Sequence, residues 1–398
     1  MIEAVDTRAR GLRSRRGEAV EAASLVRRLD WILLAATGAL VAYGLWAIAG
    51  ITRHDVSGDA NYYVTRQSVY AALGALALVA AVFVDPEYYR RYRKPIYVGT
   101  LGLMAIVLLT GAVTRGSKRW LDLGFFKFQP SEFGKLFFVL FLAGLLADRA
   151  KRIGDSRTVV SAIGFAAGPI LLVFLQPDFG TAMVYAAALA GVLFLAGTRW
   201  LHLAALGAGT LVAALLVLWI LPASGHPVLK KYQQNRLTGW THPESDPSAA
   251  TYNVQQSLNA VGAGGATGRG VKGATQTNLG FLPVHATDFV FASIAEQRGF
   301  VGVAILLLLY LLVVWRGLKI VAAARDSFSA IAAGGIVMAF LFQIFINVGM
   351  TIGIAPITGI PLPFVSVGGS AMIANLLAIG VLEAIHIRGQ GRRRGVLR

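Results

Sequence analysis

Long apolar runs separated by short polar segments dominate this sequence of 398 residues. A helix needs roughly 20 apolar residues to cross a hydrocarbon layer about 30 Å thick. Ten runs come close to that length, at 29–51, 67–85, 95–113, 131–147, 157–175, 180–197, 200–222, 289–315, 328–352 and 367–387. The pattern therefore predicts an all-α integral membrane protein with ten transmembrane helices.

The polar segments define the expected organisation of the chain. Basic tails at 1–28 and 388–398 flank one membrane domain at 29–387, and a long outer loop at 223–288 joins the seventh helix to the eighth. The first apolar run has full span length and no small-residue cleavage site, so we expect a retained helix and not a signal peptide. Residues 176–178 (Gln-Pro-Asp) separate the fifth and sixth runs. We expect two spans there, the alternative being one broken hairpin.

Composition agrees with a membrane protein and excludes several kinds of site. Hydrophobic residues make up 56% of the chain and charged residues 14%, which does not suit a surface solvated by water. Without cysteine the chain has no disulfide, thiolate metal site or cysteine nucleophile. The six histidines are scattered and form no HExxH-type zinc motif.

The distribution of positive charge predicts the orientation. The net charge is +17, and most of the 37 Lys and Arg residues lie in the two tails and in the loops on the same side of the membrane. Because cytoplasmic loops carry an excess of Lys and Arg, we expect both termini to be cytoplasmic, with the basic residues against anionic lipid headgroups. The charge is dispersed over short loops without an aromatic-interleaved patch, so we expect no nucleic-acid partner.

Four loops on the opposite, extracytoplasmic face have unusual sequences. They are 115–132, 176–181, 223–288 and 356–370, and the cytoplasmic connections have nothing comparable. Rigid membrane scaffolds place their chemistry on loops and broken helix ends. Convergence on one face therefore predicts an active or binding site that opens to the outer leaflet.

Carboxylates at the ends of these spans are the candidate catalytic groups, since a charge near hydrocarbon needs a partner or a wet cavity. Glu132 and Lys135 are three residues apart and are expected to form an ion pair on one helical face. Asp178 suits helix N-capping as well as a function. Asp288 opens the eighth span beside apolar residues, which suits a general base, with N-capping as the alternative.

Cations in the outer loops indicate an anionic substrate. Lys118 and Arg119 can bind phosphate or pyrophosphate, and Trp120 beside Arg119 can hold the face of a sugar. The segment 262–273 contains a GxGxxG pattern, but it lies in an outer loop without the strand and the following helix of a dinucleotide site. We expect a tight turn there, or a backbone nest for an anion.

Together the outer motifs resemble the shape, elongation, division and sporulation (SEDS) family over residues 29–387. The resemblance rests on the segments Gly116–Trp120 (GSKRW), Gln129–Lys135 (QPSEFGK), Gln176–Thr181 (QPDFGT), Leu282–Phe291 (LPVHATDFVF) and Pro361–Ser370 (PLPFVSVGGS). The sequence of 347–361 is more similar to the elongation branch of the family than to its division branch. Departures from the family pattern include Val284 in place of a glutamate and His285 displaced by one residue.

The resemblance implies a ten-helix peptidoglycan glycosyltransferase of the inner (cytoplasmic) membrane. Such an enzyme polymerises lipid II into a lipid-linked glycan on the outer face, with a class B penicillin-binding protein and the elongation machinery as partners. The family's essential aspartate matches Asp288 and its loop tryptophan matches Trp120. Glu132, Lys135, Asp178 and Ser366 lie in the shared motifs and are expected to contribute to substrate binding.

The resulting hypothesis assigns Asp288 as the base that takes a proton from the attacking sugar hydroxyl while pyrophosphate leaves from the opposite face, which inverts the anomeric carbon. Lys118, Arg119 or Lys135, alone or with a divalent cation such as Mg²⁺ or Mn²⁺, would offset charge on the pyrophosphate. The alternatives are a flippase for the lipid-linked precursor, a division-type polymerase and a non-catalytic scaffold.

Overall fold

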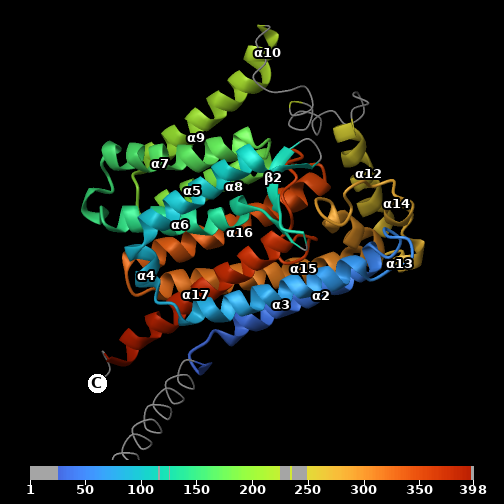
Figure 1. Cartoon of the computed structure of the whole chain (residues 1–398), viewed down its shortest axis with the longest axis horizontal. Coiled ribbons are helices and arrows are strands. Elements are labelled where there is room, and N and C mark those ends of the chain that lie inside the picture. The colour runs from blue at the N-terminus through green and yellow to red at the C-terminus, as the bar shows by residue number, and fades with distance from the viewer. Residues whose placement is uncertain (1–25, 115–116, 125, 225–233, 235–248, 396–398) are drawn as a thin grey trace, which may run out of the picture.

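A bundle of long helices makes up most of the molecule (Figure 1). The computed structural model describes residues 26–114, 117–124, 126–224, 234 and 249–395. The long helices are α2 (Trp31–Ile51), α3 (Tyr62–Phe83), α5 (Arg93–Thr110), α6 (Pro130–Ala147), α7 (Ser156–Leu175), α8 (Phe179–Leu195), α9 (Trp200–Leu215), α15 (Val290–Ala323), α16 (Ser327–Thr351) and α17 (Gly369–Gly395).

Shorter elements connect these helices. On one side lie α4 (Pro86–Arg91) and the 3-10 turn η1 (Ala150–Arg152). A π-helical turn, η2 (Leu216–Ile220), extends α9 into α10 (Leu221–Ala223). The described part of the expected 223–288 loop folds into α12 (Ala249–Gly264), α13 (Gly270–Gly273) and α14 (Thr275–Asn278), and residues 225–233 and 235–248 lie outside the described part.

Each of the ten predicted apolar runs coincides with a helix. In the described residues nine helices are long and apolar enough to span a membrane, counting 200–223 as one, and α8 is apolar but has 17 residues. The chain is therefore a multi-pass membrane protein, while the number of ten crossings stays a prediction. The fifth and sixth runs form two distinct helices, α7 and α8, which pack against each other, and their assignment as two spans stays a prediction.

The centre of the bundle is formed by α6, α16 and α17, most of whose residues are buried. Around them pack α3, α5, α8 and α15. The helix that begins at Trp200 has no buried residue and projects from the bundle (Figure 1). Asn, Gln and charged side chains in the central helices therefore have protein neighbours, whereas α9 presents apolar side chains outward.

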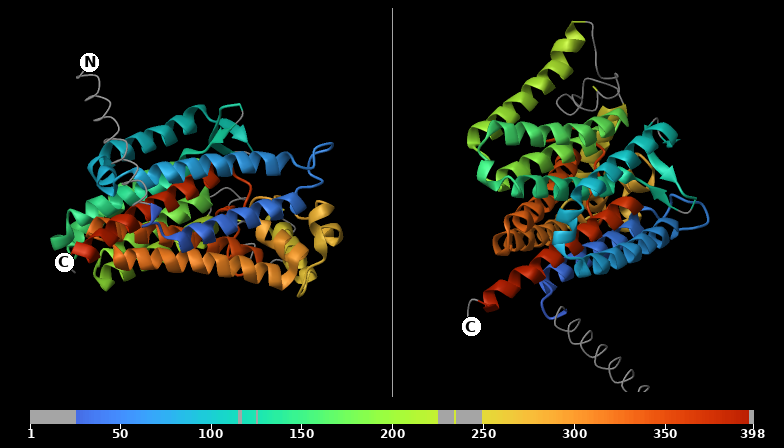
Figure 2. Two further views of the ribbon diagram at one scale, coloured as in Figure 1. Left: turned by 90° about the horizontal axis from the view of Figure 1, so that it is seen from below. Right: turned by 60° about the vertical axis from the view of Figure 1, so that its left-hand side comes forward.

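The two described chain ends lie on the same side of the bundle. The Asp30 main-chain N–H donates to Glu383 Oε2 at 2.9 Å, and Gln390 Nε2 donates to the Arg28 carbonyl at 3.4 Å. Views from two directions agree with this placement (Figure 2). The predicted common side is confirmed for residues 26–395. Residues 1–25 and 396–398 lie outside the described part, and the expected tail at 388–398 is helical as far as Gly395 because α17 continues into it.

The loop between α5 and α6 forms a small antiparallel sheet, which the sequence analysis did not predict within the otherwise helical fold. Its strands are β1 (Ala112–Thr114), β2 (Ser117–Asp122) and β3 (Lys127–Phe128), in the order β1-β2-β3. Trp120 pairs with Ala112, and Leu121 pairs with Phe128. Main-chain pairing satisfies the polar backbone of this loop, which apolar periodicity alone does not indicate.

The glycine-rich segment packs against a break in α15. Gly299 has φ +65°, outside helical geometry, and a Cβ atom there would lie 2.3 Å from the Gly268 nitrogen. Gly265, Gly268 and Gly270 also have positive φ, so the predicted tight turn is confirmed. The element before the GxGxxG pattern is the helix α12 and not a strand, in agreement with rejecting a dinucleotide site. The predicted end of the eighth span at 315 was short, because α15 continues to Ala323.

Candidate active site

Asp288 lies in a tight turn immediately before α15. The N–H groups of Thr287 and Phe289 both donate to the Val284 carbonyl, at 3.1 and 3.3 Å. The N-cap of α15 is Phe289, so Asp288 stands one residue outside the cap. This position does not favour the N-capping alternative for Asp288. Val284 has φ +58°, which costs a β-branched residue roughly 1–3 kcal/mol, so the turn is held in place by its surroundings.

Hydrogen bonds from α16 and from the 352–368 segment hold this turn. Asn347 Nδ2 donates to the Asp288 carbonyl at 2.9 Å and to the Ile360 carbonyl at 2.7 Å. Ser366 Oγ donates to the Thr287 carbonyl at 2.6 Å and accepts from the Leu362 N–H at 2.8 Å. Ser366 is buried, so its hydroxyl is used to hold the Asp288 turn, and its predicted contact with substrate stays a prediction.

Gln67 of α3 joins the same network. Its Nε2 donates to the Ser366 carbonyl at 3.1 Å, and its Oε1 accepts from the Gly368 N–H at 3.1 Å. The side chain is fully buried. Neither Gln67 nor Asn347 was predicted from the sequence to have a role, although a polar residue inside an apolar span is a signal that could have identified both.

The backbone at Gly359 lies against the carboxylate of Asp288. A Cβ atom at Gly359 would be 3.3 Å from Asp288 Oδ2, and its φ of +71° also favours glycine. On the other side of this segment, a Cβ atom at Gly180 would lie 2.4 Å from the Thr358 carbonyl oxygen. The start of α8 and the Asp288 turn therefore flank the same stretch of backbone, as the predicted convergence of outer loops requires.

Asp178 connects α8 to the small sheet. It is buried and caps α8 by accepting from the Thr181 N–H at 3.2 Å, so the capping prediction is confirmed. Its carboxylate also lies 3.5 Å from Arg119 Nη1 and accepts from Gln129 Nε2 at 3.2 Å. Arg119 Nη2 donates to the Pro177 carbonyl at 2.8 Å. Asp178 therefore caps α8 and pairs with Arg119 at the same time. Its contact with Gln129 was not predicted from the sequence.

The predicted Glu132–Lys135 ion pair is confirmed. Lys135 Nζ donates to Glu132 Oε2 at 2.8 Å and to Gln343 Oε1 of α16 at 3.0 Å. All three side chains are buried. The pair joins two central helices, and the predicted contact of either residue with substrate stays a prediction.

Lys118 and Trp120 stand on β2, on either side of Arg119. The pairing of β1 with β2 shifts register here, since Trp120 pairs with Ala112 and Lys118 pairs with Val113. The Arg119 guanidinium carbon is 5.7 Å from the centre of the Trp120 ring. Within the described part of the chain the Lys118 ammonium makes no hydrogen bond or ion pair, which leaves it available for an anion.

Two further ionisable groups near Asp288 are engaged in the protein. Glu296, fully buried, accepts from the N–H groups of Gln276 and Thr277 at 2.8 and 2.9 Å and so holds α14. His285 Nε2 lies 3.0 Å from Asp55 Oδ1, and its Nδ1 lies 3.1 Å from the Leu282 carbonyl. With both ring nitrogens occupied, His285 fastens the loop between α2 and α3 to the Asp288 turn.

The residues described here include no group of three or more His, Asp or Glu side chains placed to hold a metal ion. Mg²⁺ commonly uses one or two carboxylates together with substrate phosphates. The Asp288 carboxylate could serve such an ion arriving with pyrophosphate, and a role for Mg²⁺ or Mn²⁺ stays a prediction.

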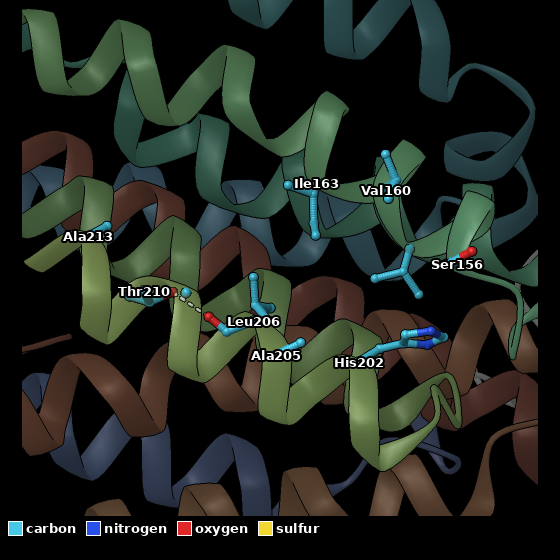
Figure 3. A pocket seen from close by; sticks show the side chains of 10 residues that line it. Ser156, Val160, Ile163, His202, Ala205, Leu206, Thr210 and Ala213 are labelled. Carbon is cyan, nitrogen blue, oxygen red and sulfur yellow. Dashed lines mark hydrogen bonds between the residues drawn. The ribbon is translucent and has the colours of Figure 1, made fainter.

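A separate cavity of about 520 Å³ lies between α7 and α9 (Figure 3). Its walls are mainly apolar and include Val159, Ile163 and Leu206, with His202 at one end. None of the candidate site residues lines it. It is therefore distinct from the site around Asp288.

Comparison with known proteins agrees with this arrangement. The chain is 36% identical over 357 residues to the peptidoglycan glycosyltransferase MrdB of Escherichia coli, covering 90% of this chain and 94% of MrdB. It is 34% identical to the stage V sporulation protein E of Bacillus subtilis, with 88% and 93% covered.

Solved structures show the same fold. A chain of a peptidoglycan synthase complex that coordinates polymerization and crosslinking matches with a TM-score of 0.76 and 31% identity, covering 91% of this chain and 98% of that one. The rod shape determining protein RodA of Thermus thermophilus matches with a TM-score of 0.68 and 28% identity, with 90% and 96% covered. The cell cycle protein family of FtsW, RodA and SpoVE matches residues 27–390. This chain belongs to that family, the SEDS family, and is similar to its RodA-like members.

Proposed function

We propose that this protein is a peptidoglycan glycosyltransferase that polymerises lipid II into glycan strands on the outer face of the inner membrane during cell elongation. The observation that carries the proposal is the position of Asp288, in a turn held by Asn347 and Ser366 with Gly359 against its carboxylate. Relatives named peptidoglycan glycosyltransferase, and a structural relative from a peptidoglycan synthase complex, support the same activity.

In the proposed reaction the Asp288 carboxylate takes a proton from the sugar hydroxyl that attacks the anomeric carbon of the growing chain. The bond from that carbon to the lipid pyrophosphate breaks on the opposite face, and the configuration inverts. Arg119 is held rigidly by Pro177 and Asp178, and Lys118 has a free ammonium among the described residues. These two cations would offset the charge on the departing pyrophosphate.

The test compares lipid II polymerisation by purified wild-type protein and by Asp288→Asn, which keeps the shape and removes the base. A positioned general base contributes roughly 10²–10⁴-fold, so we expect a rate loss in that range. Asp59→Asn is the matched control, because Asp59 lies in the outer loop between α2 and α3 and is exposed. Wild-type polymerisation by Asp288→Asn would overturn the assignment.

A flippase is the competing function, and the same protein preparation distinguishes it. The small sheet, α12 to α14 and the Asp288 turn gather at one end of the bundle (Figure 1), whereas alternating access calls for broken segments on both faces. Detergent-solubilised protein that makes no glycan but moves lipid II across a vesicle membrane would replace the enzyme proposal with the flippase.

The partner and the orientation belong to the same proposal. A class B penicillin-binding protein would cross-link the strands, and the assay with and without it measures how far polymerisation depends on it. Because the chain has no cysteine, single substitutions can report orientation. We expect an impermeant maleimide to label Ala60→Cys in intact spheroplasts and Lys151→Cys only after lysis, which places both termini in the cytoplasm.

A further inference from the structure

A stacked arginine lies where α15 breaks, away from the groups assigned to the reaction. Arg298 immediately precedes Gly299, and its guanidinium carbon is 3.7 Å from the centre of the Trp46 ring of α2. A Cβ atom at Gly302 would lie 2.3 Å from the Arg298 Cβ and 3.1 Å from Tyr43 Oη. Because Gly302 has no side chain, it leaves a space in which Arg298 lies across α15 and against α2. This space next to Trp46 is called the niche below.

The Arg298 guanidinium lies among side chains of the described residues that offer it little polar contact. Among the described residues Arg298 makes no hydrogen bond or ion pair, and its Nε is buried without a partner. The Arg298 side chain as a whole is half-buried. Next to it, the buried Gln297 also leaves Nε2 unpaired. Arginine carries five N–H donors, and leaving them unsatisfied near hydrocarbon is costly.

The surroundings face lipid at the level of a membrane interface. Trp46 is 50% exposed, and Phe300 and Val301, beside Arg298 in sequence, are 72% and 53% exposed. Trp46 lies five residues before the end of α2, about 7–8 Å along a helix that rises 1.5 Å per residue. Trp and Tyr concentrate at this depth, and an arginine there extends its charge toward headgroups.

We propose that Arg298, stacked on Trp46, binds the phosphodiester of an anionic phospholipid in the outer leaflet. The guanidinium fork of an arginine matches two phosphate oxygens, and the Trp46 ring fixes its plane. Phospholipid reaches the niche sideways from the bilayer, between the exposed apolar residues of α2 and α15. The bound lipid would thereby fasten α2 to α15 at the break.

Native mass spectrometry of the purified full-length protein with added phosphatidylglycerol tests this proposal. We expect Arg298→Leu to weaken retention of one phosphatidylglycerol about tenfold, and Arg298→Lys to weaken it less. Arg66→Leu is the matched control: Arg66 also lies over an aromatic ring, that of Tyr62, but it is exposed and donates to the Tyr62 hydroxyl at 2.7 Å. Unchanged retention in Arg298→Leu, or an equal loss in Arg66→Leu, would overturn the proposal.

Two further measurements identify the bound lipid and keep the test valid if a variant does not fold. Phosphatidylcholine should bind more weakly than phosphatidylglycerol. Selective displacement of phosphatidylglycerol by undecaprenyl pyrophosphate would instead assign the niche to the substrate lipid and contradict the phospholipid proposal. If Arg298→Leu does not fold, Trp46→Leu keeps the charge and removes the stacking ring. We expect Trp46→Leu to weaken phosphatidylglycerol retention, and wild-type retention would contradict the site.

Discussion

Asn347 links the turn that contains Asp288 to the backbone segment that faces the Asp288 carboxylate. Its Nδ2 donates to the Asp288 carbonyl at 2.9 Å and to the Ile360 carbonyl at 2.7 Å, next to Gly359. One rigid side chain of α16 therefore sets the spacing between the proposed base and the backbone facing it. Mutations that leave Asp288 intact should then still affect the reaction.

Asn347→Leu removes both hydrogen bonds and leaves two carbonyls unpaired. Each unpaired buried group costs about 1–3 kcal/mol, and a displacement of about 1 Å at a reacting group can cost 10²-fold in rate. We expect a lower unfolding temperature in detergent and a polymerisation rate that is roughly 10- to 100-fold lower. Asn61→Leu is the control, because Asn61 is exposed and its side chain makes no capping bond to α3. Similar losses in both variants would argue against a specific role.

Arg119 and Asp178 should behave as a coupled pair. Arg119→Lys keeps the charge but loses the fork that spans Asp178 and the Pro177 carbonyl. In a double-mutant cycle of polymerisation rates with Asp178→Asn, we expect a coupling energy of roughly 0.5–3 kcal/mol. Lys118→Ala should reduce the rate additively with Asp178→Asn, because Lys118 makes no hydrogen bond or ion pair among the described residues. Additivity between Arg119→Lys and Asp178→Asn would show that the pair does not act as a unit.

Variants of the buried Glu132–Lys135 pair distinguish a role in stability from a role in the reaction. Removing one partner, as in Lys135→Leu, leaves an uncompensated buried charge and should destabilise by about 3–5 kcal/mol. Replacing both residues with leucine should restore most of the stability, because desolvation of the two charges is then avoided. Polymerisation by the stable double variant is the decisive measurement. Full activity would remove both residues from the substrate contacts, and a loss would support them.

Substitution of glycine by alanine should affect stability differently at two positions of α12. A Cβ atom at Gly264 would lie 1.9 Å from the Ala295 carbonyl oxygen, so Gly264→Ala must push α12 away from α15. We expect a clear loss of thermal stability. At Gly262 a Cβ atom meets nothing within 4 Å, and Gly262→Ala should be neutral or stabilise by about 0.5–1 kcal/mol through helix propensity. Equal melting temperatures of the two variants would contradict the close packing.

Local features of the site followed from the sequence because they depend on neighbours a few residues away. The three-residue spacing of Glu132 and Lys135 predicts their ion pair, and the position of Asp178 before Gly180 predicts its cap. The contact of Arg119 with Asp178 could not be predicted in this way, since 58 residues separate Arg119 from the Pro177 carbonyl it also binds. The roles of Gln67 and Asn347 were missed for the same reason.

The sequence by itself determined the helical spans, since a backbone in hydrocarbon must satisfy its own hydrogen bonds and apolar runs of the right length have little choice but helix. It also determined that the unusual loops share one face. Only the tertiary structure decided that Asp288 stands outside its helix against Gly359, and that Arg298 meets Trp46 at a break in α15. Those relations depend on how helices distant in sequence pack, and hydropathy carries no information about which side chains then meet.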